Sequence, residues 1–195
     1  MKYSKVLSPA LFLLLLLCWA GYAHCLSDKA LRHNWEREIR WRISQGLVYV
    51  YGGNVFETGV DCSSFPYLTL KEAGAKRLQR LTADDIFRGK DGWLGIDVKI
   101  RDADHLDLVF CIWAKHRDVP LELPKSLTMP GSLTLDKAKR IRVDHIGIVI
   151  VGAKSKLLEV AHISSTRGGV IEPFKGDLER DCVGVRRLTI GDKGR

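Results

Sequence analysis

Apolar residues in the first half of the chain recur at helical spacing. Every fourth position from Leu31 to Ile43 is apolar, and Arg, Glu and Asn occupy many of the positions between. This spacing places the apolar side chains on one side of a helix. Ser27 suits its N-cap, and Gly46 suits its end. The pattern therefore predicts an amphipathic helix from Ser27 to about Gly46, laid on a hydrophobic core.

Two further helices are predicted by their end signals. The stretch from Cys62 to Ala73 is helical in character, with Pro66 near its first turn, where the missing N–H costs little, and Gly74 as its C-cap. Thr82 then suits the N-cap of a short helix from Ala83 to Phe87.

Apolar runs in the second half are typical of strands. Five such runs predict a small antiparallel sheet, and they cover Leu106 to Trp113, Val143 to Val151, Leu157 to Ser164, Val170 to Phe174 and Val183 to Ile190. Because helices come first and strands later, the fold class expected is α+β with segregated layers. A polar, proline-containing stretch at about residues 114–141 is interpreted as a loop or hairpin insertion.

The first 23 residues have the three-part pattern of a secretory signal. Basic Lys2 and Lys5 precede an apolar run from Val6 to Trp19, and cleavage fits after Ala20 or Ala23. The run is short for a spanning helix, which needs about 20 residues. We therefore expect a secreted or periplasmic domain over residues 24–195, with no stable membrane insertion after cleavage. An uncleaved N-terminal anchor is the competing reading.

Composition and net charge limit the kinds of partner that the chain is expected to bind. The chain carries 31 basic and 23 acidic side chains, a formal net charge of +8. A positive field attracts anionic polymers in general. No recognisable nucleic-acid reading motif occurs and the chain is predicted to be exported, so nucleic acid is not expected. An anionic cell envelope is the better partner, although an ordinary soluble surface explains the charge equally well. The pattern says nothing of oligomeric state.

Four cysteines follow the predicted signal, namely Cys25, Cys62, Cys111 and Cys182. An exported compartment permits disulfides. If Cys62 is a working thiol, the other three allow at most one bridge, and the sequence does not indicate which pair forms it. No Cys-x-x-Cys or His-x-x-x-His spacing occurs, so neither a structural zinc nor any other cofactor is expected.

Cys62 is the candidate nucleophile. It follows the Gly52-Gly53 turn, sits between Asp61 and Ser63, and opens a predicted helix. A helix N-terminus favours the thiolate, which is the attacking form. A buried structural cysteine, or a disulfide partner of Cys25, is the plainer alternative.

His145 is the candidate base, with a second histidine predicted beside it. A four-residue loop between the strands 143–151 and 157–164 would set Val151 opposite Lys156, and the same register sets His145 opposite His162. The two side chains would then lie on one face, with Cβ atoms about 5 Å apart. One imidazole could act as base while the other orients it.

These segments together resemble the NlpC family of bacterial cell-wall peptidases, through roughly residues 47–174. The resemblance is carried by Tyr49-x-x-Gly52-Gly53, Asp61-Cys62-Ser63, Arg80-Leu81-Thr82, Asp107-Leu108-Val109-Phe110, His145-Ile146-Gly147-Ile148 and Ala161-His162. It implies a papain-like α+β fold and hydrolysis of the bond between γ-D-glutamate and a diamino acid, or a related amide, in peptidoglycan stem peptides.

By motif position, the resemblance implies that Cys62 is the nucleophile, His145 the general base and His162 the orienting residue. It also implies substrate-binding roles. Tyr49 would polarise the carbonyl or line the site, and Asp61 and Ser63 would contact the polar end of the stem peptide. The Cys62 backbone N–H would serve the oxyanion.

The chain departs from the family pattern in two places. Ser64 stands where the family usually has glycine, which puts the shape of the pocket in question. The insertion at about 114–141 is longer than usual and could rim the cleft. Two other functions remain open: an amidase or acyltransferase of the same fold acting on a non-wall substrate, and a non-catalytic envelope-binding domain.

Overall fold

The computed structural model describes residues 28–76, 78–90, 93, 95–112, 143–152 and 157–189. The predicted signal peptide (1–23), Cys25 and the predicted insertion (114–141) lie outside these residues. Among the helices described, none combines the length and the apolar character that a bilayer-crossing segment requires.

The three predicted helices are present. Residues 28–44 form the first, and its Trp35 and Ile39 are fully buried. The second, α2, spans Ser64–Glu72. The third, α3, spans Ala83–Phe87, and the Thr82 hydroxyl accepts the Asp85 N–H as an N-cap should. Local signals were enough here because caps and apolar spacing act within one or two turns.

Six antiparallel strands form the main sheet, in the order β3-β8-β4-β5-β6-β7. Their bounds are β3 Gly95–Val98, β4 Leu108–Cys111, β5 His145–Val151, β6 Leu158–Ser164, β7 Gly168–Pro173 and β8 Cys182–Leu188. A separate two-stranded ribbon pairs β1 (Asn54–Val55) with β2 (Gly59–Val60). The mixed helix and antiparallel-sheet architecture agrees with the predicted class. The sequence patterns missed the shorter elements, which are β1, β2, β3, the 3₁₀ turn Ile100–Asp102 and the short α4 (Asp177–Asp181).

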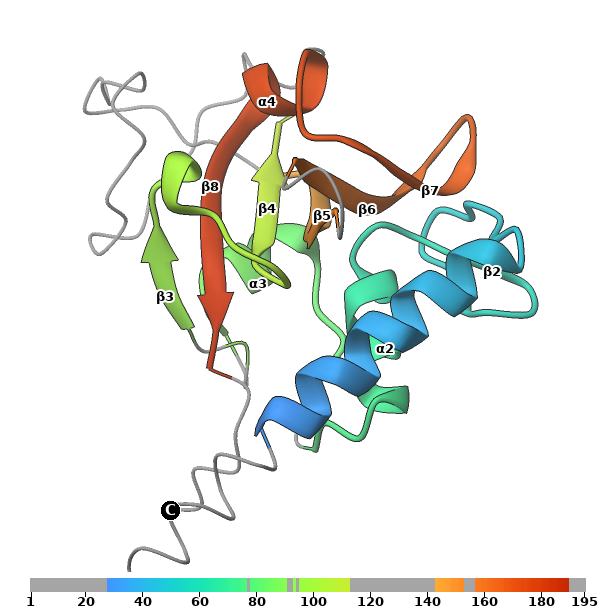
Figure 1. The fold of residues 1–195 in the computed structure, drawn as a ribbon. Coiled ribbons are helices and arrows are strands. Elements are labelled where there is room, and N and C mark those ends of the chain that lie inside the picture. Colours follow the sequence, from blue (N-terminus) through green and yellow to red (C-terminus); the bar gives the residue numbers. More distant parts are fainter. Residues whose placement is uncertain are drawn as a thin grey trace, which may run out of the picture.

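Helices cover one face of the sheet. In Figure 1 the first helix (blue) and α2 lie together on one side of the strands. The larger core joins these helices and α3 to inward residues of the strands such as Phe110 and Ile148. A smaller cluster on the opposite face includes Val109, Val149 and Leu178 of α4. Alternate residues of each strand thus serve two different cores.

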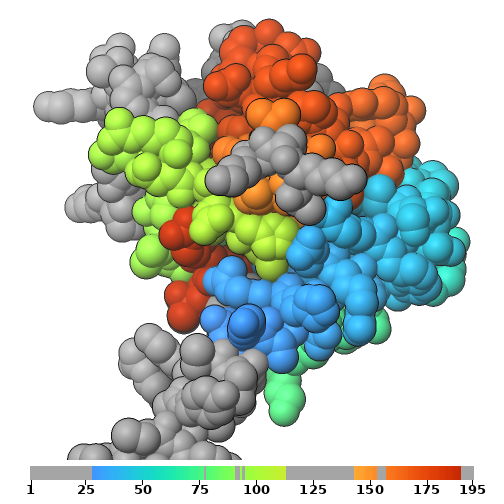
Figure 2. All heavy atoms as spheres, viewed as in Figure 1, coloured from blue at the N-terminus to red at the C-terminus, as the bar shows by residue number. Residues whose placement is uncertain are grey.

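The segment after the first helix is tied to β7. The Gly169 N–H donates to the Leu47 carbonyl at 2.9 Å, and Figure 2 shows the light-blue residues of this region adjoining the orange residues of β6 and β7. Tyr49 forms an isolated bridge with Val60. These contacts hold the turn at Gly52, whose φ of +72° suits glycine, against the sheet near the strand that carries His162.

The predicted register between β5 and β6 is wrong by two residues. Val151 pairs with Leu158 rather than Lys156, and Ile148 pairs with Ala161. The Gly152 N–H donates to the Leu157 carbonyl at 3.1 Å, so the connection keeps four positions between paired residues but lies one position later than predicted. Since side chains alternate with a period of two, a shift of two keeps each side chain on its predicted face. His145 and His162 become diagonal neighbours instead of direct partners.

Candidate active site

The turn before α2 is organised by the Asp61 carboxylate. Its Oδ1 accepts the backbone N–H of Ser63 at 3.0 Å, the backbone N–H of Ser64 at 2.7 Å and the Ser63 hydroxyl at 2.9 Å. The first N–H groups of a helix have no partner within the helix, so Asp61 supplies the acceptor in the manner of an N-cap. This turn fixes where Cys62 lies.

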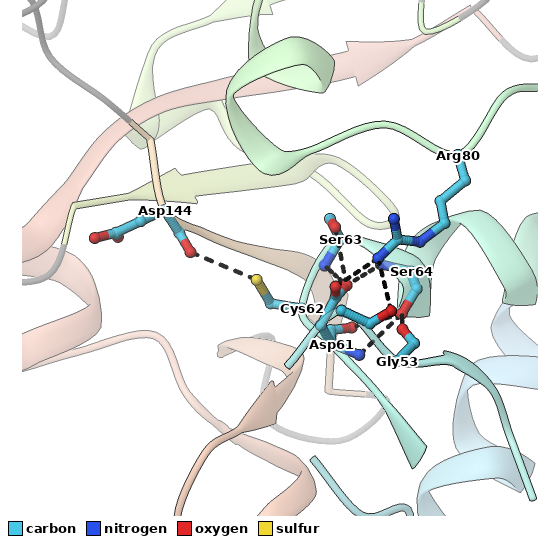
Figure 3. A network of polar contacts seen from close by, with 8 residues as sticks. Gly53, Asp61, Cys62, Ser63, Ser64, Arg80 and Asp144 are labelled. Atoms are coloured by element: carbon cyan, nitrogen blue, oxygen red, sulfur yellow. Dashed lines mark hydrogen bonds and ion pairs between the residues drawn. The ribbon is translucent and has the colours of Figure 1, made fainter. Parts of the chain in front are cut away.

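Two other residues lock the same turn. Arg80 donates from Nη2 to Asp61 Oδ2 at 2.6 Å, next to the Gly52 carbonyl at 3.4 Å. The buried Ser64 hydroxyl donates to the Gly53 carbonyl at 2.6 Å and accepts the Asp61 N–H at 2.9 Å. Figure 3 shows this cluster around Asp61. Ser64 thus connects the glycine turn to the cysteine turn.

Cys62 is directed away from that cluster toward the start of β5, as Figure 3 shows. Its thiol donates to the Asp144 carbonyl at 3.5 Å, and the Ile146 N–H lies near enough to the sulfur to lower the pKa of the thiol. The sulfur therefore lies against the main chain on both sides of His145. Cys62 also acts electrostatically on Cys111, the cross-strand partner of His145.

The expectation of a thiolate favoured by the helix N-terminus is not met. Burial, followed by the negative charge of Asp61, raises the pKa of the Cys62 thiol to about 12. Hydrogen bonds from backbone N–H groups act in the opposite direction but are weaker. At neutral pH the resting side chain is thus a protonated thiol, and attack requires a base that removes the proton.

Tyr49 lies near the thiol. Burial raises the pKa of its phenol, and the charges of Cys62 and Asp61 raise it further. Tyr49 is held by its bridge to Val60, directly before Asp61 in the chain. The structure thus gathers Tyr49, Asp61, Cys62 and Ser63 into one region.

The two histidines form a hydrogen-bonded pair. His145 Nε2 lies 3.0 Å from His162 Nδ1, and the rings meet edge to face with centroids 5.0 Å apart. Both are buried, with 3% and 1% of their surfaces exposed. Burial, together with His162, lowers the pKa of His145 to about 3. Burial also lowers the pKa of His162, although Glu172 opposes the effect. Both imidazoles are therefore neutral at pH 7.

Gly147 makes room for this pair. A Cβ at this position would collide with Cγ1 of Val160 on β6. Val160 lies two residues before His162 on the same face of the strand. A larger residue at position 147 would push β6 away from β5 and disturb the contact between the histidines.

Glu172 is the functional candidate that the sequence reasoning missed. Its Oε1 lies 2.7 Å from His162 Nε2, and Arg167 donates to its Oε1 at 2.8 Å and to its Oε2 at 2.7 Å. The signal that could have found it is the second hairpin. Ser164 pairs with Gly168, and that register places Glu172 opposite Val160, on the face of His162.

The predicted substrate contacts at Asp61 and Ser63 have a structural role in this chain. Both oxygens of Asp61 already accept hydrogen bonds, and the Ser63 hydroxyl donates to one of them. Cys62, Cys111 and Cys182 are free thiols. Within the described ranges no cluster of three or more His, Cys, Asp or Glu side chains is arranged to hold a metal ion.

No family model and no curated protein matches the chain. Among solved structures, it is similar to the crystal structure of an NlpC/P60 family protein from Bacillus cereus ATCC 10987, with a TM-score of 0.46 and 20% identity. The similarity covers 73% of this chain and 36% of that chain, so this chain spans about a third of its length. A likeness at that TM-score supports no conclusion about family or activity, which must come from the chain's own residues.

Proposed function

We propose that this chain is a secreted cysteine endopeptidase with a papain-like, NlpC-type fold that hydrolyses amide bonds in peptidoglycan stem peptides. The observation that carries the proposal is the position of the Cys62 sulfur against the main chain on both sides of His145, whose ring is hydrogen-bonded to His162. A thiol, a base and a residue that orients the base are the parts of this class of catalysis.

The protonation states favour general-base catalysis over a preformed ion pair. The Cys62 thiol is protonated and His145 is neutral at pH 7. His145 would take the thiol proton as the sulfur attacks the carbonyl carbon. The imidazolium formed would then give that proton to the leaving amine. Water would next attack the thioester, and its proton would return through His145 to release the acid and restore the thiol.

Nδ1 is the nitrogen of His145 that would take part. Nε2 is hydrogen-bonded to His162. Nδ1 is the ring nitrogen nearer to its own main chain, and the Cys62 sulfur touches the main chain on both sides of this residue. This arrangement supports the transfer of the proton from sulfur to Nδ1.

The developing oxyanion would be stabilised by the backbone near Cys62. The N–H groups of Ser63 and Ser64 already donate to Asp61, so the Cys62 N–H is the donor proposed for this turn. The pKa of the Tyr49 phenol is raised above its ordinary value of about 10, so Tyr49 stays protonated well beyond neutral pH. Its hydroxyl would supply a second donor.

Specificity is the finer part of the proposal. The bond between γ-D-glutamate and a diamino acid is the expected target. Without Lys2 and Lys5 of the predicted signal, 29 basic and 23 acidic side chains leave a net charge of +6, which suits an anionic wall. Digesting purified peptidoglycan and identifying the soluble fragments by mass would name the bond. Fragments cut at that bond by the wild-type chain, and none with Cys62→Ala, are the expected result.

Other products would separate the rival functions. Circular dichroism should show Cys62→Ala folded, so that lost activity reports the thiol alone. Cleavage by Cys62→Ala at the wild-type rate would refute the assignment of the nucleophile. Salt-sensitive binding to the wall without any turnover would favour a non-catalytic envelope-binding domain. Turnover of soluble amides or esters but not of peptidoglycan would favour an amidase or acyltransferase.

A further inference from the structure

A line of hydrogen-bonded side chains crosses three neighbouring strands behind the thiol. His145 on β5 contacts His162 on β6 at 3.0 Å, and His162 contacts Glu172 on β7 at 2.7 Å. Arg167, in the turn between β6 and β7, binds both carboxylate oxygens of Glu172. The order of the strands in the sheet thus sets the order of these groups in space.

The acceptor at the end of the line determines where each proton lies. Burial alone would raise the pKa of Glu172, but hydrogen bonds from Arg167 and His162 outweigh it and lower that pKa. An ionised carboxylate only accepts hydrogen bonds. His162 must therefore carry its proton on Nε2 and donate it to Glu172. A neutral imidazole has one N–H, so His162 Nδ1 is then an acceptor.

The proton positions on His162 determine those on His145. Because His162 Nδ1 accepts, His145 Nε2 must donate and carries the proton. His145 is neutral, so its Nδ1 then carries an electron pair instead of a proton. That is the state a base needs at the nitrogen nearer to its own main chain, and the Cys62 sulfur lies 3.5 Å from the carbonyl of the preceding residue, Asp144.

Arg167 completes the arrangement by balancing charge. The Glu172 carboxylate raises the pKa of His162, whereas the Arg167 guanidinium lowers it. With burial acting in the same direction as Arg167, His162 stays neutral next to a carboxylate. A charged His162 would have protons on both nitrogens and could not accept a hydrogen bond from His145 Nε2.

We infer that Glu172 is a positioning residue that acts through His162 to fix the tautomer of His145, so that Nδ1 is the basic nitrogen. Its effect on catalysis rests on the proposed function of Cys62 and His145, whereas its effect on the tautomers does not. Glu172 touches neither the thiol nor the substrate carbonyl in this scheme. It acts on His145 through the intervening ring of His162 and so determines which ring nitrogens carry the protons.

Nitrogen-15 NMR of the histidine rings tests the inference without any assay of activity. In the wild-type chain both His145 and His162 should be protonated on Nε2 and bare on Nδ1 at neutral pH. Glu172→Ala removes the acceptor, and both rings should then populate the two tautomers. Glu172→Gln keeps a carbonyl acceptor and should largely preserve the wild-type pattern. Glu179→Ala, an exposed glutamate on α4, is the matched control and should change nothing.

Kinetics supply the second readout. A hydrogen bond to a charged group corresponds to about 10- to 100-fold in rate, so Glu172→Ala should lower kcat by about that factor. KM should change little, since Glu172 does not touch the substrate. Glu172→Gln should recover most of the loss, which a merely structural role would not require.

The outcomes separate this inference from the proposed function. A wild-type spectrum with His145 protonated on Nδ1 overturns the inference even if no variant folds. Unchanged tautomers and unchanged kcat in Glu172→Ala overturn it while leaving the thiol mechanism intact. If Cys62→Ala keeps full activity but the tautomers depend on Glu172, the proposed function fails and the assignment of Glu172 stands.

Discussion

Replacing Asp61 with alanine should destabilise the chain by about 2–6 kcal/mol. The carboxylate is the acceptor for the buried N–H groups of Ser63 and Ser64, at 3.0 and 2.7 Å. Leaving a buried donor without a partner costs about 1–3 kcal/mol per group. The ion pair with Arg80 adds little, because the Arg80 side chain is 31% exposed and solvent screens it.

Urea unfolding followed by circular dichroism measures this loss. Asp61→Asn keeps an oxygen acceptor for both N–H groups, so it should lose less than half as much stability as Asp61→Ala. Asp177→Ala is the matched control, since the Asp177 side chain is 75% exposed. The control should stay within about 0.5 kcal/mol of the wild-type value.

The same pair of variants distinguishes the two roles assigned to Asp61. A residue that only contacts substrate would raise KM and leave the free energy of unfolding unchanged. If Asp61→Ala unfolds within about 0.5 kcal/mol of the wild-type chain, the capping argument is refuted. Removing the negative charge should also lower the pKa of Cys62, because Asp61 raises it. Asp61→Asn should therefore be alkylated at Cys62 faster than the wild-type chain at the same pH.

Ser64, the buried His145 and the cysteine pair on β4 and β8 each give a further prediction. Ser64→Ala removes the hydroxyl that joins the Asp61 N–H to the Gly53 carbonyl, but the Asp61 N–H keeps its own bond to the Gly53 carbonyl at 3.1 Å. The change should therefore cost about 0.5–1.5 kcal/mol in urea unfolding; no change would contradict it. Because the pKa of His145 is about 3 when folded and about 6.5 when unfolded, the unfolded chain binds more protons in that window. The free energy of unfolding should fall with falling pH by up to about 1.4 kcal/mol per pH unit. The fall should be shallower in His145→Leu. Parallel curves of unfolding free energy against pH for the two chains would refute the lowered pKa of His145. Cys111 lies opposite Cys182, so glutathione disulfide should join them by exchange and release two molecules of glutathione. Peptide mapping without reductant would then find the two peptides linked. Two separately alkylated thiols would contradict the prediction.

Features that depend on a few neighbouring residues were predictable from the sequence. Thr82 caps α3 and the apolar residues of the first helix are buried as expected, since both depend on contacts within a turn or two. Strand β3 was missed because its exposed residues Gly95 and Ile96 lack a buried alternation. It is a strand because it pairs with β8 at the edge of the sheet.

The sequence predicted the site only as far as it predicted the face of the strand on which each residue lies. His145 and His162 fall on one face in any register that shifts by an even number. Their diagonal contact depends on where the connection between β5 and β6 begins, one position later than predicted, and no local signal indicated that position. Glu172 depends on two successive registers, and Asp61 depends on its position relative to Arg80, so neither role follows from a motif alone.

Capture of the acyl group on the thiol is the most direct test of the central claim. Peptidoglycan stem peptide would be mixed with the wild-type chain and quenched in acid, and the mass of the peptide that contains Cys62 would be measured. The account predicts a thioester adduct on Cys62 with the mass of the acyl fragment, formed more slowly when His145 is replaced. Products that accumulate with no adduct on Cys62, at a rate that does not depend on His145, would contradict it.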